Sequence, residues 1–261
     1  MTYPPATWRL IREPQPRSGV LNLAIDEAIL RAVAEGKAPP TLRLYGWSPP
    51  ALTLGRGQPY ADADLQTLRR DGIILLRRMT GGTAVLNRRE LTYAVAVRHD
   101  DARLSGPIAE SYRGISEGLV MALIQLGVVG ADASGREPGA RPSHSERTPV
   151  CFEIPSDYEV TVGGRKLVGS SQMRIRGGIL QHGSLPLRGD IGEIGRYLTS
   201  RPSPERVRAV AMTLFEALGR TVTWEDAADA VQVSLQRTLN LTLVPSPLTA
   251  GGRKRVEALV V

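Results

Sequence analysis

The chain contains a single cysteine, Cys151, and a lysine, Lys166, lies fifteen positions after it. A thiol has an ordinary pKa of about 8.5, so Cys151 needs a neighbouring cation or a helix N-terminus to be substantially thiolate at neutral pH. A thiolate beside an ammonium can take up an acyl group as a thioester and pass it on, which predicts acyl-transfer chemistry. The alternatives are a structural cysteine and a solvated surface lysine, because spacing in the sequence does not bring two side chains together.

The three histidines offer a second way to activate a thiol. His99 follows a predicted strand, His144 lies in a polar segment, and His182 follows an apolar run. Three scattered histidines with one cysteine do not have the spacing of a zinc site, so no metal is expected. A pair of Cys151 and His182 remains an alternative to the pair with Lys166, although no third residue that would orient the histidine is evident.

A glycine turn offers a place for a ligand. Gly81 and Gly82 follow a predicted strand, and glycines allow a ligand to approach the backbone closely. Arg77 and Arg78 could donate hydrogen bonds to a carboxylate, phosphate or thioester oxygen. The turn matches neither the Walker A loop nor the dinucleotide fingerprint, so a tight turn flanked by surface arginines is the alternative.

Secondary structure must position these residues, and the apolar pattern predicts helices and strands. Helices are expected at 18–36, 62–70, 107–126, 203–219 and 224–239. Strands are expected at 41–45, 51–54, 73–76 and 91–97, the first two joined by a turn. In the first helix Ser18 is the expected N-cap, and Asp26 and Glu27 are expected on the solvent-facing side. A short strand and a glycine-broken tail end the sequence, and we expect one domain over 1–261 with a helical C-terminal extension from about residue 200.

Lys166 lies in a predicted β-hairpin. Residues 158–168 alternate between apolar and polar side chains on either side of a two-residue turn, Gly163-Gly164. In this register Thr161 lies opposite Lys166, whereas Leu167 faces the core. Lys166 is therefore expected on the more polar side of the hairpin.

Residues 130–147 are rich in Gly, Pro and Ser and lead into Cys151. They contain almost no large apolar side chains, so we expect a mobile loop outside the core. A lid or docking site beside the nucleophile and a surface insertion without function both remain open.

The composition indicates a globular protein with acidic partners. At 261 residues and 42% hydrophobic content, the chain has enough apolar material for a buried core. No stretch reaches the roughly 20 apolar residues of a membrane span, and no signal peptide is recognisable, so a cytoplasmic location without a membrane partner is expected. The formal net charge of +7 favours acidic partners, although the arginine content can also reflect a GC-rich genome. Aromatic residues make up only 5%, so the stacking pattern of a nucleic-acid binder is missing.

Five blocks together closely resemble the lipoate-protein ligase and octanoyltransferase family. They are RRMTGGTAVL at 77–86, ELTYAV at 90–95, PVCFEIPSDYEV at 149–160, GRKLVGSSQMR at 164–174 and ILQHGSL at 179–185. With the first helix and GRGQ at 55–58 they cover roughly residues 8–200, in the family's order. The resemblance implies the biotin/lipoyl protein ligase catalytic fold, an α/β (α+β) domain with mixed β-sheets flanked by helices, which form a tunnel for a medium-length acyl chain.

The resemblance also implies roles for individual residues. Cys151 corresponds to the nucleophile of the cysteine-dependent octanoyltransferases of the LipM type, and Lys166 to the lysine that contacts the acyl carbonyl. The implied substrate-binding residues are Arg77, Gly81, Gly82 and Ala84 on the loop that walls the acyl site, Gly169 in the lysine block, and His182 and Gly183 on the strand that lines the pocket. Asn87 departs from the family pattern, which often has His there.

The implied activity is transfer of an octanoyl group from octanoyl-acyl carrier protein, through an acyl-Cys thioester, to the lysine of a lipoyl domain, with the glycine cleavage H protein as the expected acceptor. Such an enzyme needs no cofactor and is expected to be a monomer. Roughly 60 residues follow position 200, too few for a ligase accessory domain, which together with the cysteine favours transfer. The alternatives are ATP- and Mg-dependent lipoate ligation, amidotransfer between lipoyl domains, and a module that only binds acidic proteins or nucleic acid.

Overall fold

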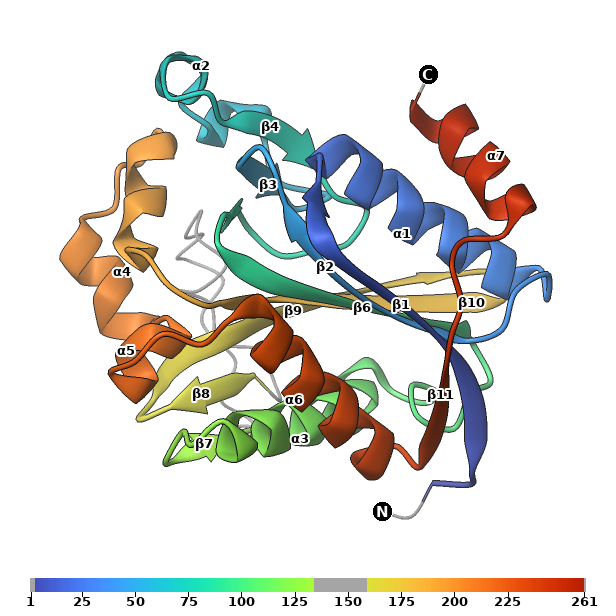
Figure 1. Ribbon diagram of the computed structural model, residues 1–261. Coiled ribbons are helices and arrows are strands. Elements are labelled where there is room, and N and C mark those ends of the chain that lie inside the picture. The colour runs from blue at the N-terminus through green and yellow to red at the C-terminus, as the bar shows by residue number, and fades with distance from the viewer. Residues whose placement is uncertain (1–2, 134–158, 261) are drawn as a thin grey trace.

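The computed structural model describes residues 3–133 and 159–260, and an eight-stranded sheet runs through its centre (Figure 1). Its strands are β1 (Ala6–Arg17), β2 (Thr41–Trp47), β6 (Glu90–Arg98), β7 (Ala131–Asp132), β8 (Val160–Val162), β9 (Arg165–Ile175), β10 (Gly178–Pro186) and β11 (Leu241–Pro245). Their order is β11-β1-β2-β6-β10-β9-β8-β7. β1 is parallel to β2 and β11, whereas the pairings from β2 through β6 and β10 to β9 are antiparallel.

A second sheet has three strands in the order β4-β3-β5. These are β3 (Ala51–Leu54), β4 (Ile74–Arg77) and β5 (Val85–Asn87). β3 is parallel to β4 and antiparallel to β5, so this sheet is mixed as well. The predicted fold class, mixed β-sheets flanked by helices, is therefore confirmed.

Helices cover both faces of the large sheet (Figure 1). They are α1 (Gly19–Ala34), α2 (Leu65–Arg70), α3 (Ile108–Gln125), α4 (Pro204–Val210), α5 (Leu214–Leu218), α6 (Trp224–Thr238) and α7 (Ala250–Val260), with 3-10 turns at Tyr60–Asp62 and Ile191–Tyr197. α3 packs against α6 on one face, and α1 lies on the other with α7 against it. In the described part of the chain, no helix is long and apolar enough to cross a membrane.

Strand β6 shows why the two faces differ. Leu91, Tyr93 and Val95 point into a core shared with α3 and α6, whereas Ala94 and Ala96 pack towards α1. This is the two-residue alternation of a strand buried on both faces. The small alanines leave room for α1 to lie close to the sheet, and the α1 side is where the pocket described below is found.

The first predicted helix is confirmed, but one of its side chains was assigned to the wrong side. The Ser18 hydroxyl accepts a hydrogen bond from the Leu21 amide at the start of α1, as expected of an N-cap. Asp26 is not on a solvent-facing side; it is 2% exposed and forms an ion pair with Arg43 of β2. Arg43 compensates the charge of the buried aspartate. Because Arg43 lies on the sheet, the spacing of apolar residues in the helix could not reveal it.

Other expectations need correction after position 200 and at the N-terminus. The helix predicted at 203–219 is two helices, α4 and α5, because the intervening backbone pairs with β9: Ala211 bridges to Lys166, and the Met212 amide donates to the Lys166 carbonyl. The tail forms α7 instead of an irregular end, and β1 was not predicted. The strands at 41–45 and 51–54 exist, but they lie in different sheets.

Candidate active site

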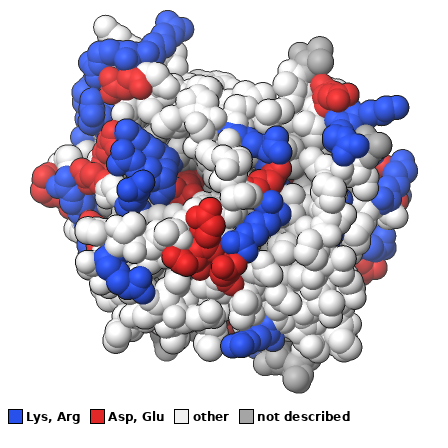
Figure 2. Space-filling model, in the orientation of Figure 1, with Lys and Arg blue, Asp and Glu red and all other residues white. Residues whose placement is uncertain are grey.

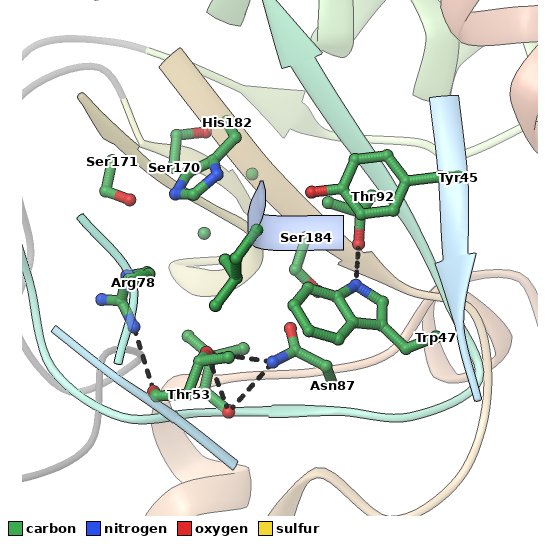
Figure 3. Close-up of a pocket in the computed structure, with 14 residues that line it drawn as sticks. Tyr45, Trp47, Thr53, Arg78, Asn87, Thr92, Ser170, Ser171, His182 and Ser184 are labelled. Atoms are coloured by element: carbon green, nitrogen blue, oxygen red, sulfur yellow. Dashed lines mark hydrogen bonds between the residues drawn. The ribbon is translucent and has the colours of Figure 1, made fainter. Parts of the chain in front are cut away.

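A pocket lies between the two sheets on the α1 side (Figure 3). Its walls come from α1, β2, β3, β5, β6, β9 and β10, together with the segment after β4. The lining residues are Leu23, Tyr45, Trp47, Thr53, Arg78, Val85, Asn87, Thr92, Gly169, Ser170, Ser171, His182, Gly183 and Ser184. Three of the predicted substrate-binding residues, Gly169, His182 and Gly183, are therefore brought together here.

Gly183 of β10 shows how closely this wall is packed. A Cβ atom at this position would lie 2.6 Å from Cε1 of Tyr93 and 2.7 Å from the carbonyl oxygen of Gly169. Neither neighbour can easily move, since both belong to strands that pair with β10. A side chain here would collide with Tyr93 and the Gly169 backbone, so only glycine fits.

His182 is held at both ring nitrogens. Its Nε2 lies 2.7 Å from Oγ1 of Thr80, and its Nδ1 lies 3.4 Å from Oδ2 of Asp26. The Ser171 hydroxyl donates to Thr80 at 2.8 Å, on the side of the ring away from Asp26. An ionised carboxylate only accepts, so the contact with Asp26 needs a proton on Nδ1. Asp26 is thus the orienting group for His182 that was not evident from the sequence.

Asp26 also anchors a buried charge network. Arg43 Nη1 lies 2.7 Å from Asp26 Oδ1, and the Tyr45 hydroxyl donates to Oδ2 at 2.7 Å. Burial alone would raise the pKa of Asp26, but the adjacent Arg43 guanidinium and the hydrogen bonds to its oxygens keep it below its ordinary value. Glu13 of β1 pairs with the same guanidinium at 2.7 Å, so Arg43 is compensated by two carboxylates. The network fixes α1 to the sheet directly behind His182.

Lys166 is positioned by a bulge in β9. Thr161 of β8 pairs with Lys166, as predicted, but the residue before Thr161 pairs with Val168, so Leu167 is an extra residue on β9. Leu167 and Val168 are adjacent, yet both lie in the core under α3 and α6. By the alternation of a strand, Lys166 is on the opposite face from Leu167, the face on which Gly169 lines the pocket.

Lys166 is buried, so the interpretation of a solvated hairpin lysine is wrong. It is 3% exposed, and its ammonium forms an ion pair with Glu159, whose side chain is only 10% exposed. A buried ammonium needs such a partner, since an uncompensated charge in the interior is costly. Cys151 and the predicted loop at 130–147 lie outside the described residues, apart from 130–133. The pairing of Cys151 with Lys166 therefore stays a prediction.

Arg77 and the glycine turn contact the GRGQ segment at 55–58 and hold it in place. Arg77 donates to the carbonyls of Gly55 at 2.7 Å and Gln58 at 2.6 Å, and so fastens the GRGQ segment. A Cβ atom at Gly55 would lie 1.8 Å from the carbonyl oxygen of Gly82, so the two segments touch through their backbones. Gly81 and Gly82 are exposed in this structure. None of the three, Arg77, Gly81 or Gly82, lines the pocket of Figure 3, and their substrate-binding role stays a prediction.

Arg78 and Ala84 occupy interior positions. Arg78 is 5% exposed, so it is not a surface arginine; it lines the pocket and donates to the carbonyls of Thr53 at 3.0 Å and Gly81 at 2.7 Å. Ala84 is fully buried in the core of the smaller sheet. Ala84 packs in this core and does not line the pocket of Figure 3, so its role in substrate binding remains a prediction.

Several lining residues were not predicted. Asn87 donates to Oγ1 of Thr53 at 2.9 Å, and the Trp47 indole donates to Oγ1 of Thr92 at 2.8 Å (Figure 3). Thr92 belongs to the ELTYAV block, where polar residues alternate with apolar ones. That alternation was the available signal, since a polar residue in a strand buried on both faces needs an internal partner.

The described residues contain no group of three His, Cys, Asp or Glu side chains that could hold a metal ion. The pocket instead combines apolar walls with hydroxyl, amide and imidazole groups and the Arg78 guanidinium, which are already hydrogen-bonded to the protein. Such a cavity suits a slender chain with one polar end more than a charged ligand.

Comparisons with known proteins agree with this architecture. The family model described as the lipoyl protein ligase A/B catalytic domain matches residues 18–236. Octanoyltransferase LipM of Symbiobacterium thermophilum is 41% identical over 260 residues, covering 97% of this chain and 94% of the relative. Octanoyltransferase LipM of Geobacillus kaustophilus is 40% identical over 248 residues, covering 91% and 88%.

Solved structures show the same fold. A lipoate-protein ligase A bound with ATP has a TM-score of 0.78 at 22% identity, covering 98% of this chain and 94% of that chain. A bi-partite lipoate protein ligase from Thermoplasma acidophilum has a TM-score of 0.77 at 22% identity, covering 98% and 92%. The family model spans most of the sequence and the LipM relatives cover nearly all of it, so this chain belongs to the lipoyl protein ligase A/B catalytic-domain family.

Proposed function

We propose that this protein is an octanoyltransferase of lipoate biosynthesis that moves the octanoyl group from octanoyl-acyl carrier protein to the lysine of a lipoyl domain. The observation that carries this proposal is the similarity to octanoyltransferases LipM, 40–41% identical over almost the whole chain. The pocket supports it, because Leu23, Val85 and Trp47 offer apolar surface to an alkyl chain. Gly169, on the same face as Lys166, links that pocket to the proposed reaction centre.

The proposed reaction has two balanced steps. The thiolate of Cys151 attacks the thioester carbonyl, forms an octanoyl-Cys151 thioester, and expels the carrier's thiolate, which takes up a proton. The neutral amine of the target lysine then attacks this thioester, forms the amide, loses a proton and releases the Cys151 thiolate. No oxidant, reductant or cofactor is needed in either step.

Lys166 is assigned two tasks in this scheme. Its ammonium stabilises the thiolate of Cys151 and donates a hydrogen bond to the oxyanion that develops in each step. Glu159 compensates the buried charge and fixes the ammonium, so the donor needs little reorganisation during reaction. A buried ammonium acts in surroundings of low dielectric, where its interaction with an oxyanion is stronger than in water.

The partners follow from charge and from the family. The net charge of +7 favours acidic carriers, and Figure 2 shows that one face of the molecule has groups of arginine and lysine among a smaller number of acidic side chains. The bi-partite ligase of Thermoplasma acidophilum has an E2 lipoyl domain as its partner. We propose a lipoyl domain, with the glycine cleavage H protein as the first to test, as acceptor, and a cytoplasmic monomer as the active form.

The central test is intact-protein mass spectrometry after incubation with octanoyl-acyl carrier protein. We expect one added octanoyl group in the wild type and none in Cys151→Ala; an adduct that survives this substitution contradicts the nucleophile. Lys166→Ala should lose transfer while keeping a cooperative unfolding transition. Lys37→Ala is the matched control, because Lys37 is exposed and its ion-pair partner in the described part of the chain is Glu35, and it should transfer normally.

The same assay separates the related activities. Transfer from octanoyl-acyl carrier protein without ATP is expected, whereas a requirement for ATP with free lipoate would identify a ligase. A preference for octanoyl-H protein as donor would identify an amidotransferase. Salt-sensitive binding of carriers without any acyl-enzyme would leave only a binding module.

A further inference from the structure

The proposed acyl pocket contains more hydroxyl groups than an alkyl chain requires. Besides Tyr45, whose hydroxyl donates to Asp26 at 2.7 Å, five lining side chains carry one: Thr53, Thr92, Ser170, Ser171 and Ser184. A saturated chain offers these groups no hydrogen bond, so binding it would leave any unpartnered hydroxyl buried without a partner. The pocket can accept such a chain only if other groups of the protein accept the hydrogen bonds that these hydroxyls donate.

Three of the hydroxyls are paired with groups behind the wall. Ser171 donates to Thr80 at 2.8 Å, and the Ser170 hydroxyl shares a hydrogen bond with the Tyr93 hydroxyl at 2.7 Å. Thr53 lies 3.4 Å from the carbonyl oxygen of Val85 and also accepts from an amide. The remaining two hydroxyls have a single common acceptor.

That acceptor is Glu90. Its Oε1 accepts from the Thr92 hydroxyl at 2.7 Å, and its Oε2 accepts from the Ser184 hydroxyl at 2.6 Å. Thr92 in turn accepts from the indole of Trp47 at 2.8 Å, so one carboxyl group orients three lining side chains. Figure 3 shows Trp47, Thr92 and Ser184 together on one wall of the pocket.

Glu90 is an unusual residue in this position. It is 4% exposed, and no Lys, Arg or His forms an ion pair with it within residues 3–133 and 159–260. Burial raises its pKa from the ordinary value to about 7, an effect that the two hydroxyl donors only partly offset. An unpaired carboxyl is seldom retained in a protein interior, and a hydrophobic residue here would have lacked the capacity to accept two hydrogen bonds.

We propose that Glu90 is a positioning residue for acyl recognition: by accepting the hydroxyl hydrogens of Thr92 and Ser184, it gives the pocket a wall without free donors that an alkyl chain can contact. This inference rests on the proposed octanoyl transfer and identifies what allows the polar wall to select an alkyl substrate. Replacing the carboxylate by an amide changes the wall. The amide oxygen accepts from one hydroxyl, while the NH2 group donates to the other and turns that hydroxyl's hydrogen towards the chain.

The experiment compares octanoyl- and butanoyl-acyl carrier protein as donors for the wild type and Glu90→Gln at pH 8, where the carboxylate form predominates. We expect KM for the octanoyl donor to rise about tenfold in Glu90→Gln, while kcat changes less than twofold and the butanoyl donor is little affected. Asp64→Asn is the matched control, because Asp64 also accepts from a threonine hydroxyl, at 2.9 Å, but lies at the start of α2. It should retain the wild-type preference.

A second variant separates positioning from a general loss of stability. Ser184 has Glu90 as its hydrogen-bond acceptor, so the double variant Glu90→Gln, Ser184→Ala removes the hydroxyl that the amide would turn inward. We expect it to recover most of the preference for octanoyl over butanoyl. If Glu90→Gln keeps the wild-type KM for octanoyl, or if both donors suffer equally and the double variant rescues neither, the inference is wrong.

Equilibrium binding of free octanoate and butanoate, measured by calorimetry, distinguishes this inference from the proposed function. If no octanoyl transfer is found in the wild type, the proposed function fails. If Glu90→Gln loses its selectivity for octanoate over butanoate, the positioning role of Glu90 is still supported. Unchanged selectivity would contradict that role even if the wild type transfers octanoyl groups.

Discussion

Glu90 makes the stability of the protein depend on pH in a direction opposite to that of most carboxylates. Its pKa in the folded protein is about 7, whereas the ordinary value is 4.5. Between these two values the folded state binds more protons than the unfolded state, so the free energy of unfolding falls as pH rises from about 4.5 to about 7. Above that range the effect is complete, because the carboxyl group is ionised in both states.

The size of the effect follows from the shift. A difference of about 2.5 pH units at 1.36 kcal/mol per unit corresponds to about 3 kcal/mol of unfolding free energy for a fully buried carboxyl group. Glu90→Gln removes this titration but keeps the shape of the side chain. The wild type should therefore lose about 3 kcal/mol relative to the variant between pH 4.5 and pH 8.

Urea unfolding at half-unit intervals from pH 4.5 to 8 would measure the difference, since the other titrating groups cancel between the two proteins. Asp64→Asn again serves as the control. Hydrogen bonds from the backbone and hydroxyl of Thr67 lower the pKa of Asp64, so its contribution is present above pH 3.8 and is lost only as the pH falls below that value. Parallel curves for the wild type and Glu90→Gln across the whole range would refute the reasoning.

Two further substitutions test the walls of the site. Gly183→Ala places a Cβ within 2.7 Å of Tyr93 and of the carbonyl oxygen of Gly169. We therefore expect a loss of about 1–3 kcal/mol in unfolding free energy and a fall in kcat/KM. Wild-type values for both quantities would show that the strands can move apart to accept the methyl group. Asp26→Asn leaves Arg43 with one carboxylate partner instead of two. We expect about 3 kcal/mol of destabilisation in urea unfolding, whereas a change below 1 kcal/mol would mean that the network contributes little.

Elements whose partners are close in the sequence were predictable. The apolar spacing and Ser18 gave the start of α1, and the hairpin before Lys166 followed from Gly163-Gly164, whose φ angles of 56° and 78° are those a two-residue turn requires. The register of that hairpin was also correct, with Thr161 opposite Lys166. Local patterns carry this information because both strands and the turn lie within a dozen residues.

Elements that depend on distant partners were not predictable in the same way. β1 pairs with β11, and α7 is held against α1 by contacts that include the ion pair between Arg255 and Glu35 at 2.8 Å. The pair Gly251-Gly252 weakens the helical pattern of α7, so only the packing reveals the helix. Asp26 was misplaced for the same reason, because its ion partner belongs to the sheet.

The site was predictable to the extent that the family blocks named its residues. His182 and Gly183 were found in this way, and the structure places both in the pocket. The burial of Lys166 depends on the bulge at Leu167, and no glycine or other turn residue at this position predicts a bulge. Glu90 stood in a recognised block without an assigned role, since its purpose depends on two hydroxyls, one of which lies on another strand.

The pairing of β11 with β1 also determines when the sheet can be completed during synthesis. Ala6 pairs with Leu241 and Leu10 with Pro245, so the partners are 235 positions apart in the chain. At the usual rate of about 5–20 residues per second, the outer edge of β1 waits roughly 10–50 s for its neighbour. An unpaired edge can join the wrong strand, and prolines discourage such pairing. Residues 6–10 of β1, the stretch that pairs with β11, contain no proline, so this edge stays open to wrong pairing until β11 emerges.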